Sequence, residues 1–92
     1  MSRITFRAEA LADLEGIQAW YEDVAPDSVP RVFGDIFRTI DQLGRFPRTG
    51  MRVPDRPFRR IVTRRYYFKI AYETTGDQVV VLGIFRFQDR ES

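Results

Sequence analysis

The chain has 92 residues, of which 43% are hydrophobic and 30% are charged. This length allows one domain, residues 1–92, with one modest core, and the composition is too apolar for a disordered chain. There is no apolar run of membrane-spanning length and no signal-peptide core at the N-terminus, so we expect a cytoplasmic protein without membrane contact. Cysteine and histidine are absent, which excludes thiolate and imidazole chemistry, and we expect neither a metal nor a cofactor.

Charge is distributed unevenly along the chain. Residues 1–45 contain five basic and eight acidic residues, a net charge of −3, whereas residues 46–92 contain ten basic and five acidic residues, a net charge of +5. Fourteen of the 15 basic residues are arginine, whose planar guanidinium binds carboxylates and phosphates through paired hydrogen bonds. This pattern predicts an acidic partner, either a phosphate or an acidic peptide. The alternative is a solvated sheet face whose charges pair with acids on the helices.

The N-terminal half is predicted to form a short strand and two helices. Residues 3–7 alternate in polarity as a strand does, and apolar residues recur at helical spacing over residues 8–24 and again up to residue 43. Pro26 lies in the break between the two helical segments, and Gly44 is placed to end the second. Because the connection is short, we expect an antiparallel helical hairpin.

The C-terminal half is predicted to be mostly strand. Residues 46–57 contain three prolines and one glycine, which indicates a loop. Strands are expected at about 58–63, 66–74 and 78–85. The last of these is apolar without alternation, which predicts burial on both faces and a central position in the sheet. The order β-α-α-β-β-β predicts an α+β fold, with the helical hairpin packed on a small antiparallel sheet.

The strand expected at 66–74 has two different faces. Phe68, Ile70 and Tyr72 share one face, because side chains alternate along a strand, and we expect this face to pack on the helices. Lys69 lies on the other face, together with some of the arginines of the run that begins at Arg59. The open side of the sheet is therefore predicted to be basic.

Three short motifs occur in a fixed order along the chain and precede the apolar strand "VVVLGIF". They are "AxxDLxxI" at Ala10, Asp13, Leu14 and Ile17, followed by Trp20-Tyr21; "LxxxPxxG" at Leu43, Pro47 and Gly50; and an aromatic-basic-"IxY" strand at Phe68, Lys69, Ile70 and Tyr72. In this order and spacing, the sequence resembles the RelE/ParE superfamily of bacterial type II toxins over nearly its whole length.

The resemblance implies a toxin that a cognate antitoxin neutralises by wrapping an extended or helical segment around it in a hetero-oligomer. ParE-like members of the superfamily poison DNA gyrase, whereas RelE-like members cut mRNA on the ribosome. The helical half and the "FPRTG" turn look more ParE-like, so a gyrase inhibitor is the favoured interpretation. An mRNA endonuclease and a non-toxic antitoxin-binding module remain the alternatives.

The resemblance also implies which residues would act. In an mRNA endonuclease the catalytic candidates are Arg65, Tyr67, Lys69 and Arg86. Arg86 falls where many relatives carry a histidine, and a guanidinium stabilises charge but is a poor proton shuttle, which disfavours efficient cleavage. The candidates for binding the target or the antitoxin are Arg59, Arg60, Arg64, Arg65, Lys69, Arg86, Arg90 and Trp20. For Trp20 the alternative is a core or rim aromatic.

Overall fold

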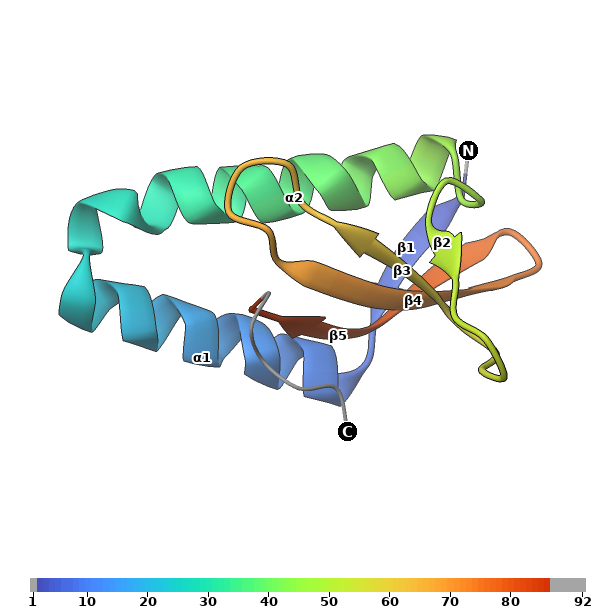
Figure 1. Cartoon of the computed structure of the whole chain (residues 1–92), viewed down its shortest axis with the longest axis horizontal. Helices are drawn as coiled ribbons and strands as arrows, with labels where there is room; N and C mark the ends of the chain where they lie inside the picture. Colours follow the sequence, from blue (N-terminus) through green and yellow to red (C-terminus); the bar gives the residue numbers. More distant parts are fainter. Residues whose placement is uncertain (1, 87–92) are drawn as a thin grey trace.

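The computed structural model describes residues 2–86, which form two helices packed on a five-stranded sheet (Figure 1). The elements are β1 (Arg3–Phe6), α1 (Ala8–Val24), a 3-10 turn (Pro26–Ser28), α2 (Val29–Arg45), β2 (Met51–Arg52), β3 (Arg59–Val62), β4 (Lys69–Thr75) and β5 (Gln78–Phe85). The two helices run antiparallel beside each other (Figure 1). The predicted α+β class and the helical hairpin are confirmed.

The sheet is mixed rather than purely antiparallel. Its strand order is β1-β5-β4-β3-β2. β1 lies parallel to β5, with Arg3 opposite Gln78 and Phe6 opposite Val81, while the other three strand pairs are antiparallel. The expectation of an antiparallel sheet is therefore wrong for β1. An alternating pattern identifies a strand but not its neighbour, and the intervening elements are long enough for the crossover that a parallel pair requires.

The segment expected to be a loop, residues 46–57, contains the two-residue strand β2. The turn that follows it reverses the chain, with the Arg56 N–H donating to the Val53 carbonyl at 3.1 Å. Proline suits the second position of such a turn, and Asp55 takes a φ of 62° at the third. The reversal places Arg52 opposite Arg59 on β3. Two residues are too few to produce an alternating pattern, so the sequence did not indicate this strand.

The core lies between the helices and one face of the sheet. Phe68, Ile70 and Tyr72 are fully buried and pack against the helices, as expected. β5 lies between two strands, but the prediction that both of its faces are buried is wrong. Val79 and Val81 are fully buried, whereas Val80 is only partly buried, because both helices pack on the same face of the sheet.

Gly44 does not end the second helix, which continues to Arg45. Instead, Gly44 lies where the start of β1 meets α2, with room for no more than a methyl group. The Ser2 N–H donates to the Gly44 carbonyl at 2.9 Å, and a Cβ at Gly44 would already lie 3.5 Å from Cδ1 of Ile4. A larger side chain would push the start of β1 away from the helix.

The Tyr72 hydroxyl holds the loop after α2 against the sheet. It donates to the Pro47 carbonyl and accepts from the Gly50 N–H, both at 2.8 Å. A Cβ at Gly50 would clash with the Tyr72 hydroxyl, so only glycine fits there. The "LxxxPxxG" motif and the aromatic-basic-"IxY" motif, which are separate in the sequence, therefore form one structural unit.

Replacing Tyr72 with phenylalanine should lower the free energy of unfolding by about 1–3 kcal/mol, because two buried backbone groups lose their partner. Burial also raises the pKa of Tyr72 above its ordinary value of 10.0. The folded state thus holds this proton more tightly than the unfolded state. The resulting stabilisation is complete below about pH 10 and is lost as the pH rises through the folded-state pKa. Urea denaturation at pH 7 and above pH 10 measures both effects.

The matched control is Tyr66→Phe, because the Tyr66 hydroxyl makes no hydrogen bond to another residue within 2–86. Tyr66→Phe should be nearly as stable as the wild type at pH 7. It should also lose stability above pH 10 as the wild type does. Equal urea midpoints for wild type and Tyr72→Phe would contradict the role given to this hydroxyl.

Candidate interaction surface

The turn between β3 and β4, residues 63–68, is held by a buried carboxylate of α2. Asp35 is almost fully buried and accepts hydrogen bonds from the N–H groups of Arg65 at 3.2 Å and Tyr66 at 2.8 Å. Within the turn, the Thr63 hydroxyl accepts from the Phe68 N–H at 2.9 Å. These bonds fix the backbone of the turn while its arginine pair stays exposed to solvent.

Tyr67, in the same turn, combines exposure with an unfavourable backbone conformation. Its φ is 60°, and 57% of its surface is exposed. The left-handed region costs a bulky residue of the order of 1–3 kcal/mol, and such outliers cluster at functional sites. Burial of the ring does not offset this cost, because the ring is mostly in solvent. Tyr67 is therefore placed by the turn as a surface aromatic beside arginines and Lys69.

On the side away from β4, the end of β5 lies against α1 instead of against another strand. β1 pairs with β5 only as far as Val81. Beyond that point the Ile84 N–H donates to Oδ2 of Asp13 on α1, at 2.9 Å. Further along, α1 and β5 enclose an open hollow of about 220 Å³ whose lining includes Ile17 and Tyr21. The Asp13 side chain thus replaces the missing strand partner and positions the hollow beside it.

An aromatic and a guanidinium meet at the rim of this hollow. The Arg86 guanidinium carbon lies 5.1 Å from the Trp20 ring centroid, within cation–π range. Trp20 packs edge-on against Tyr21, with ring centroids 4.8 Å apart, and 46% of its surface remains exposed. Burial raises the pKa of Tyr21, and repulsion from Tyr66 adds to the rise although Arg86 opposes it. Tyr21 is therefore neutral at pH 7, and the hollow offers apolar surface beside a permanent positive charge.

Most of the predicted partner-binding residues gather where β4 begins and β5 ends. Lys69 lies opposite Phe85 in the β4–β5 register, next to Arg86. The rings of Tyr21 and Tyr66, with centroids 6.4 Å apart, connect α1 to the β3–β4 turn. We call this region the basic end of the sheet. Its members are Arg64, Arg65, Tyr67, Lys69, Arg86 and Trp20.

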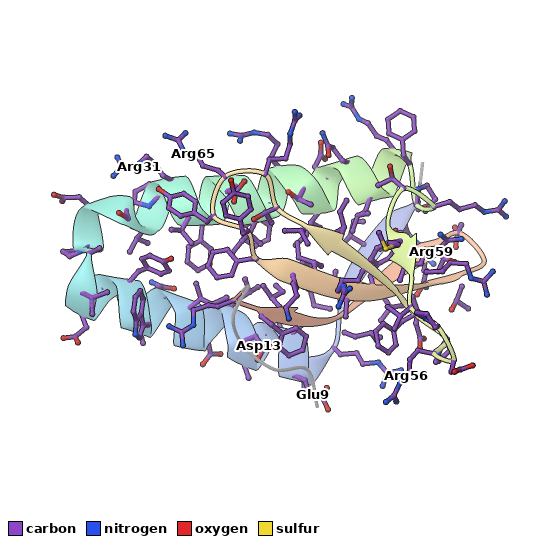
Figure 2. The ribbon with its side chains drawn as sticks, in the orientation of Figure 1. Glu9, Asp13, Arg31, Arg56, Arg59 and Arg65 are labelled. Carbon is purple, nitrogen blue, oxygen red and sulfur yellow. The ribbon has the colours of Figure 1, made fainter. Side chains whose placement is uncertain are left out.

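Two predicted residues, Arg59 and Arg60, lie elsewhere. Arg60 lies in register with Ala71 on the face away from the helices. Arg59 lies at the other end of β3, and its Nη1 donates to the carbonyls of Gly50 at 2.9 Å and Arg48 at 3.4 Å. Figure 2 shows the separation, with Arg56 and Arg59 at one end of the molecule and Arg65 near the other. Arg90 falls outside the described residues.

Sequence reasoning did not single out Tyr21, Asp35, Arg52 or Arg56 as contributors to a site. Their roles depend on contacts between distant segments, and each looks like an ordinary surface or helix residue in the sequence. Within residues 2–86, no group of three or more carboxylates could hold a metal ion. The two helices, over the part of the chain that the structure describes, also lack the length and apolar character needed to cross a membrane.

Several solved structures share this fold of two helices packed on a mixed five-stranded sheet. A chain of the chromosomal ParDE TA system from P. aeruginosa superimposes with a TM-score of 0.80 at 22% identity, over 96% of this chain and 98% of that one. A chain of the intact E. coli RelBE toxin–antitoxin complex superimposes with a TM-score of 0.66 at 12% identity, over 98% of this chain and 100% of that one. Protein HP0894 from Helicobacter pylori superimposes with a TM-score of 0.63 at 14% identity, over 97% of this chain and 98% of that one.

The family comparison matches residues 4–91 to the ParE toxin of the type II toxin–antitoxin system, parDE. This chain therefore belongs to the ParE toxin family. The comparison with curated proteins gave no significant match. The superfamily named from the sequence motifs, and the ParE branch favoured within it, are both confirmed.

Replacing Tyr67 tests the strain in the β3–β4 turn. Tyr67→Gly should be more stable than Tyr67→Ala by about 1 kcal/mol, because glycine adopts a φ of 60° without a steric penalty and alanine does not. At a position with an extended or helical φ, the alanine variant would instead be the more stable of the two. Urea denaturation of both variants measures the difference. Equal stabilities, or a more stable alanine variant, would show that the turn does not hold Tyr67 in the left-handed region.

Proposed function

We propose that this chain is a toxin that inhibits DNA gyrase and that a cognate antitoxin neutralises it by direct binding. The observation that carries the proposal is the family match, which covers residues 4–91, nearly the whole chain. The basic end supports it, because exposed guanidiniums, Lys69 and two exposed aromatics form a surface suited to an acidic macromolecular partner.

The chemistry of the basic end favours binding over RNA cleavage. Cleavage through a 2′-hydroxyl requires groups that accept and donate protons during the reaction. The guanidinium groups of Arg65 and Arg86 can bind and stabilise negative charge, but a guanidinium is a poor proton shuttle. The raised pKa of Tyr21 makes this phenol a weaker proton donor at neutral pH, not a stronger one. These groups can bind and stabilise negative charge, which is what an inhibitor needs.

An mRNA endonuclease is the second candidate, and one observation favours it. Arg65, Tyr67, Lys69 and Arg86, the catalytic candidates named from the sequence, all belong to the basic end. Positive charge and an exposed aromatic are what single-stranded RNA binds, through its phosphates and stacked bases. The same variants therefore serve to test both targets.

The antitoxin is expected to cover a different surface, at the β1 edge of the sheet. β1 is one of the two edge strands, and the rings of Phe6 on β1 and Phe37 on α2 lie 6.3 Å apart. Phe37 is 43% exposed, stacks on Phe33, and borders an open hollow of about 340 Å³. An outer strand edge beside exposed apolar rings fits an extended or helical segment of a partner protein.

The gyrase target can be tested with purified protein. The wild-type chain should inhibit supercoiling by DNA gyrase. The double variant Lys69→Ala/Arg86→Ala should need at least a tenfold higher concentration, because it removes two positive charges of the basic end. Arg45→Ala is the matched control, since Arg45 is exposed at the end of α2, ten residues beyond the Asp35 that binds the backbone of Arg65. Thermal melts confirm that all three chains are folded.

Normal supercoiling with an excess of protein that arrests growth would refute the gyrase proposal. Cuts in ribosome-bound mRNA that disappear in the double variant would instead establish the second candidate. Expression without growth arrest would leave a non-toxic antitoxin-binding module as the function.

The antitoxin surface can be tested separately. Phe37→Glu should weaken binding of the antitoxin encoded beside this chain at least thirtyfold, because an exposed aromatic at an interface centre contributes roughly 2 kcal/mol or more. Calorimetric titration measures the affinity. Gln42→Glu adds the same charge at an exposed position of α2 and should bind as the wild type does. Undiminished antitoxin affinity in Phe37→Glu would place the antitoxin elsewhere.

A further inference from the structure

A second basic site lies at the end of the sheet opposite the basic end. Arg52 on β2, Arg56 in the turn after it and Arg59 on β3 line a polar hollow of about 190 Å³. Glu73 and Thr74, near the end of β4, complete its lining together with Phe58. Arg56 and Arg59 lie close to each other in Figure 2, far from Arg65. This hollow is not part of the surface proposed for gyrase or for the antitoxin.

The arrangement of these arginines is electrostatically unfavourable in the free protein. Arg52 and Arg59 lie directly opposite each other in the β2–β3 ladder, where like charges destabilise a sheet. Arg56 is held nearby by the turn hydrogen bond to Val53 and by Pro57, which restricts the residue before it. The side chains of Arg52 and Arg56 make no hydrogen bond or ion pair with any residue from 2 to 86. A bound anion would remove the repulsion.

Arg59 is held in a defined orientation before any ligand binds. Its Nη1 donates to the carbonyls of Gly50 and Arg48, and the Tyr72 hydroxyl in turn fixes the Gly50 loop. Both hydrogen bonds come from Nη1, so the Nε and Nη2 groups of the same guanidinium remain as donors. A donor whose orientation is already fixed loses little conformational entropy on binding, which favours a specific site.

The charge and the number of donors indicate the ligand. Three arginines and Glu73 give the hollow a net charge of +2, which complements a phosphate monoester carrying close to −2. Three guanidiniums supply more N–H donors than the two oxygens of a carboxylate can accept, whereas a phosphate offers at least three oxygens. The Thr74 hydroxyl adds a neutral donor, and Phe58 adds an aromatic surface. We propose that this hollow binds a phosphate monoester, either that of a nucleotide or the terminal phosphate of a nucleic-acid strand.

The proposal is tested with the full-length chain at low ionic strength. Inorganic phosphate, AMP and a short single-stranded DNA oligonucleotide with a 5′-phosphate are titrated separately while amide chemical shifts and heat are recorded. At least one of them should bind saturably, with the shifts centred on the hollow. Saturable binding of inorganic phosphate or AMP would identify a free phosphate compound as the source. Binding of the oligonucleotide alone would identify the phosphorylated end of a nucleic-acid strand.

The variants separate a built site from diffuse positive charge. Arg52→Gln/Arg56→Gln should weaken binding at least tenfold, whereas Arg31→Gln removes an exposed arginine outside the hollow and should bind like the wild type. Glu73→Gln should tighten binding severalfold, because it removes the one carboxylate that repels the ligand. This third variant tests the site even where the double variant does not fold.

Three results would overturn the proposal. They are no saturable binding of any of the three ligands, an equal loss of affinity in Arg31→Gln, and unchanged affinity in Glu73→Gln. Preferential binding of a glutamate-rich peptide over all three would also overturn it and would assign the hollow to an acidic protein segment. None of these readouts involves gyrase or growth arrest, so the phosphate site stands or falls independently of the proposed target.

Discussion

The unequal length of β1 and β5 is the constraint on which the rest of the structure depends. β1 has four residues and covers β5 only up to Val81, which leaves the second half of an eight-residue strand without a neighbour on that side. The carboxylate of Asp13 accepts the Ile84 N–H in place of a strand carbonyl. A buried N–H without a partner is costly, so this contact determines where α1 lies. The hollow in which Trp20 meets Arg86 exists because α1 occupies that edge.

At two other places where the chain leaves the sheet, a buried polar side chain likewise provides the hydrogen bonds that a neighbouring strand would otherwise supply. Asp35 accepts two backbone N–H groups of the β3–β4 turn, and the Tyr72 hydroxyl bridges two backbone groups of the loop after α2. Each polar side chain is buried and joins segments more than 20 residues apart. The arginines at both ends of the sheet are therefore exposed side chains on backbone that is rigidly held. Rigid presentation of charge favours selective binding over nonspecific attraction.

Features set by local periodicity could be predicted from the sequence, and features set by distant contacts could not. The helix over residues 8–24 and the inward face of Phe68, Ile70 and Tyr72 follow from spacing alone. The parallel pairing of β1 with β5 cannot be predicted in this way, because no local pattern specifies which strand lies beside β1. Trp20 and Arg86 were each named as candidates, but their contact depends on where α1 lies. Arg52 and Arg56 fall in a segment that reads as loop, and only the turn between them brings both to Arg59.

The pairing of the first strand with the last has a consequence for synthesis of the protein on the ribosome. Residue 3 lies opposite residue 78, a separation of 75 residues. At 5–20 residues per second, about 4–15 s pass between the synthesis of these two positions. During that interval the helical hairpin is complete, but β5, which must cover its apolar face, has not yet been made. The sheet, and with it the junction of Trp20 and Arg86, can assemble only when the final residues emerge. A nascent chain therefore exposes the apolar face of the hairpin before it carries the assembled sheet.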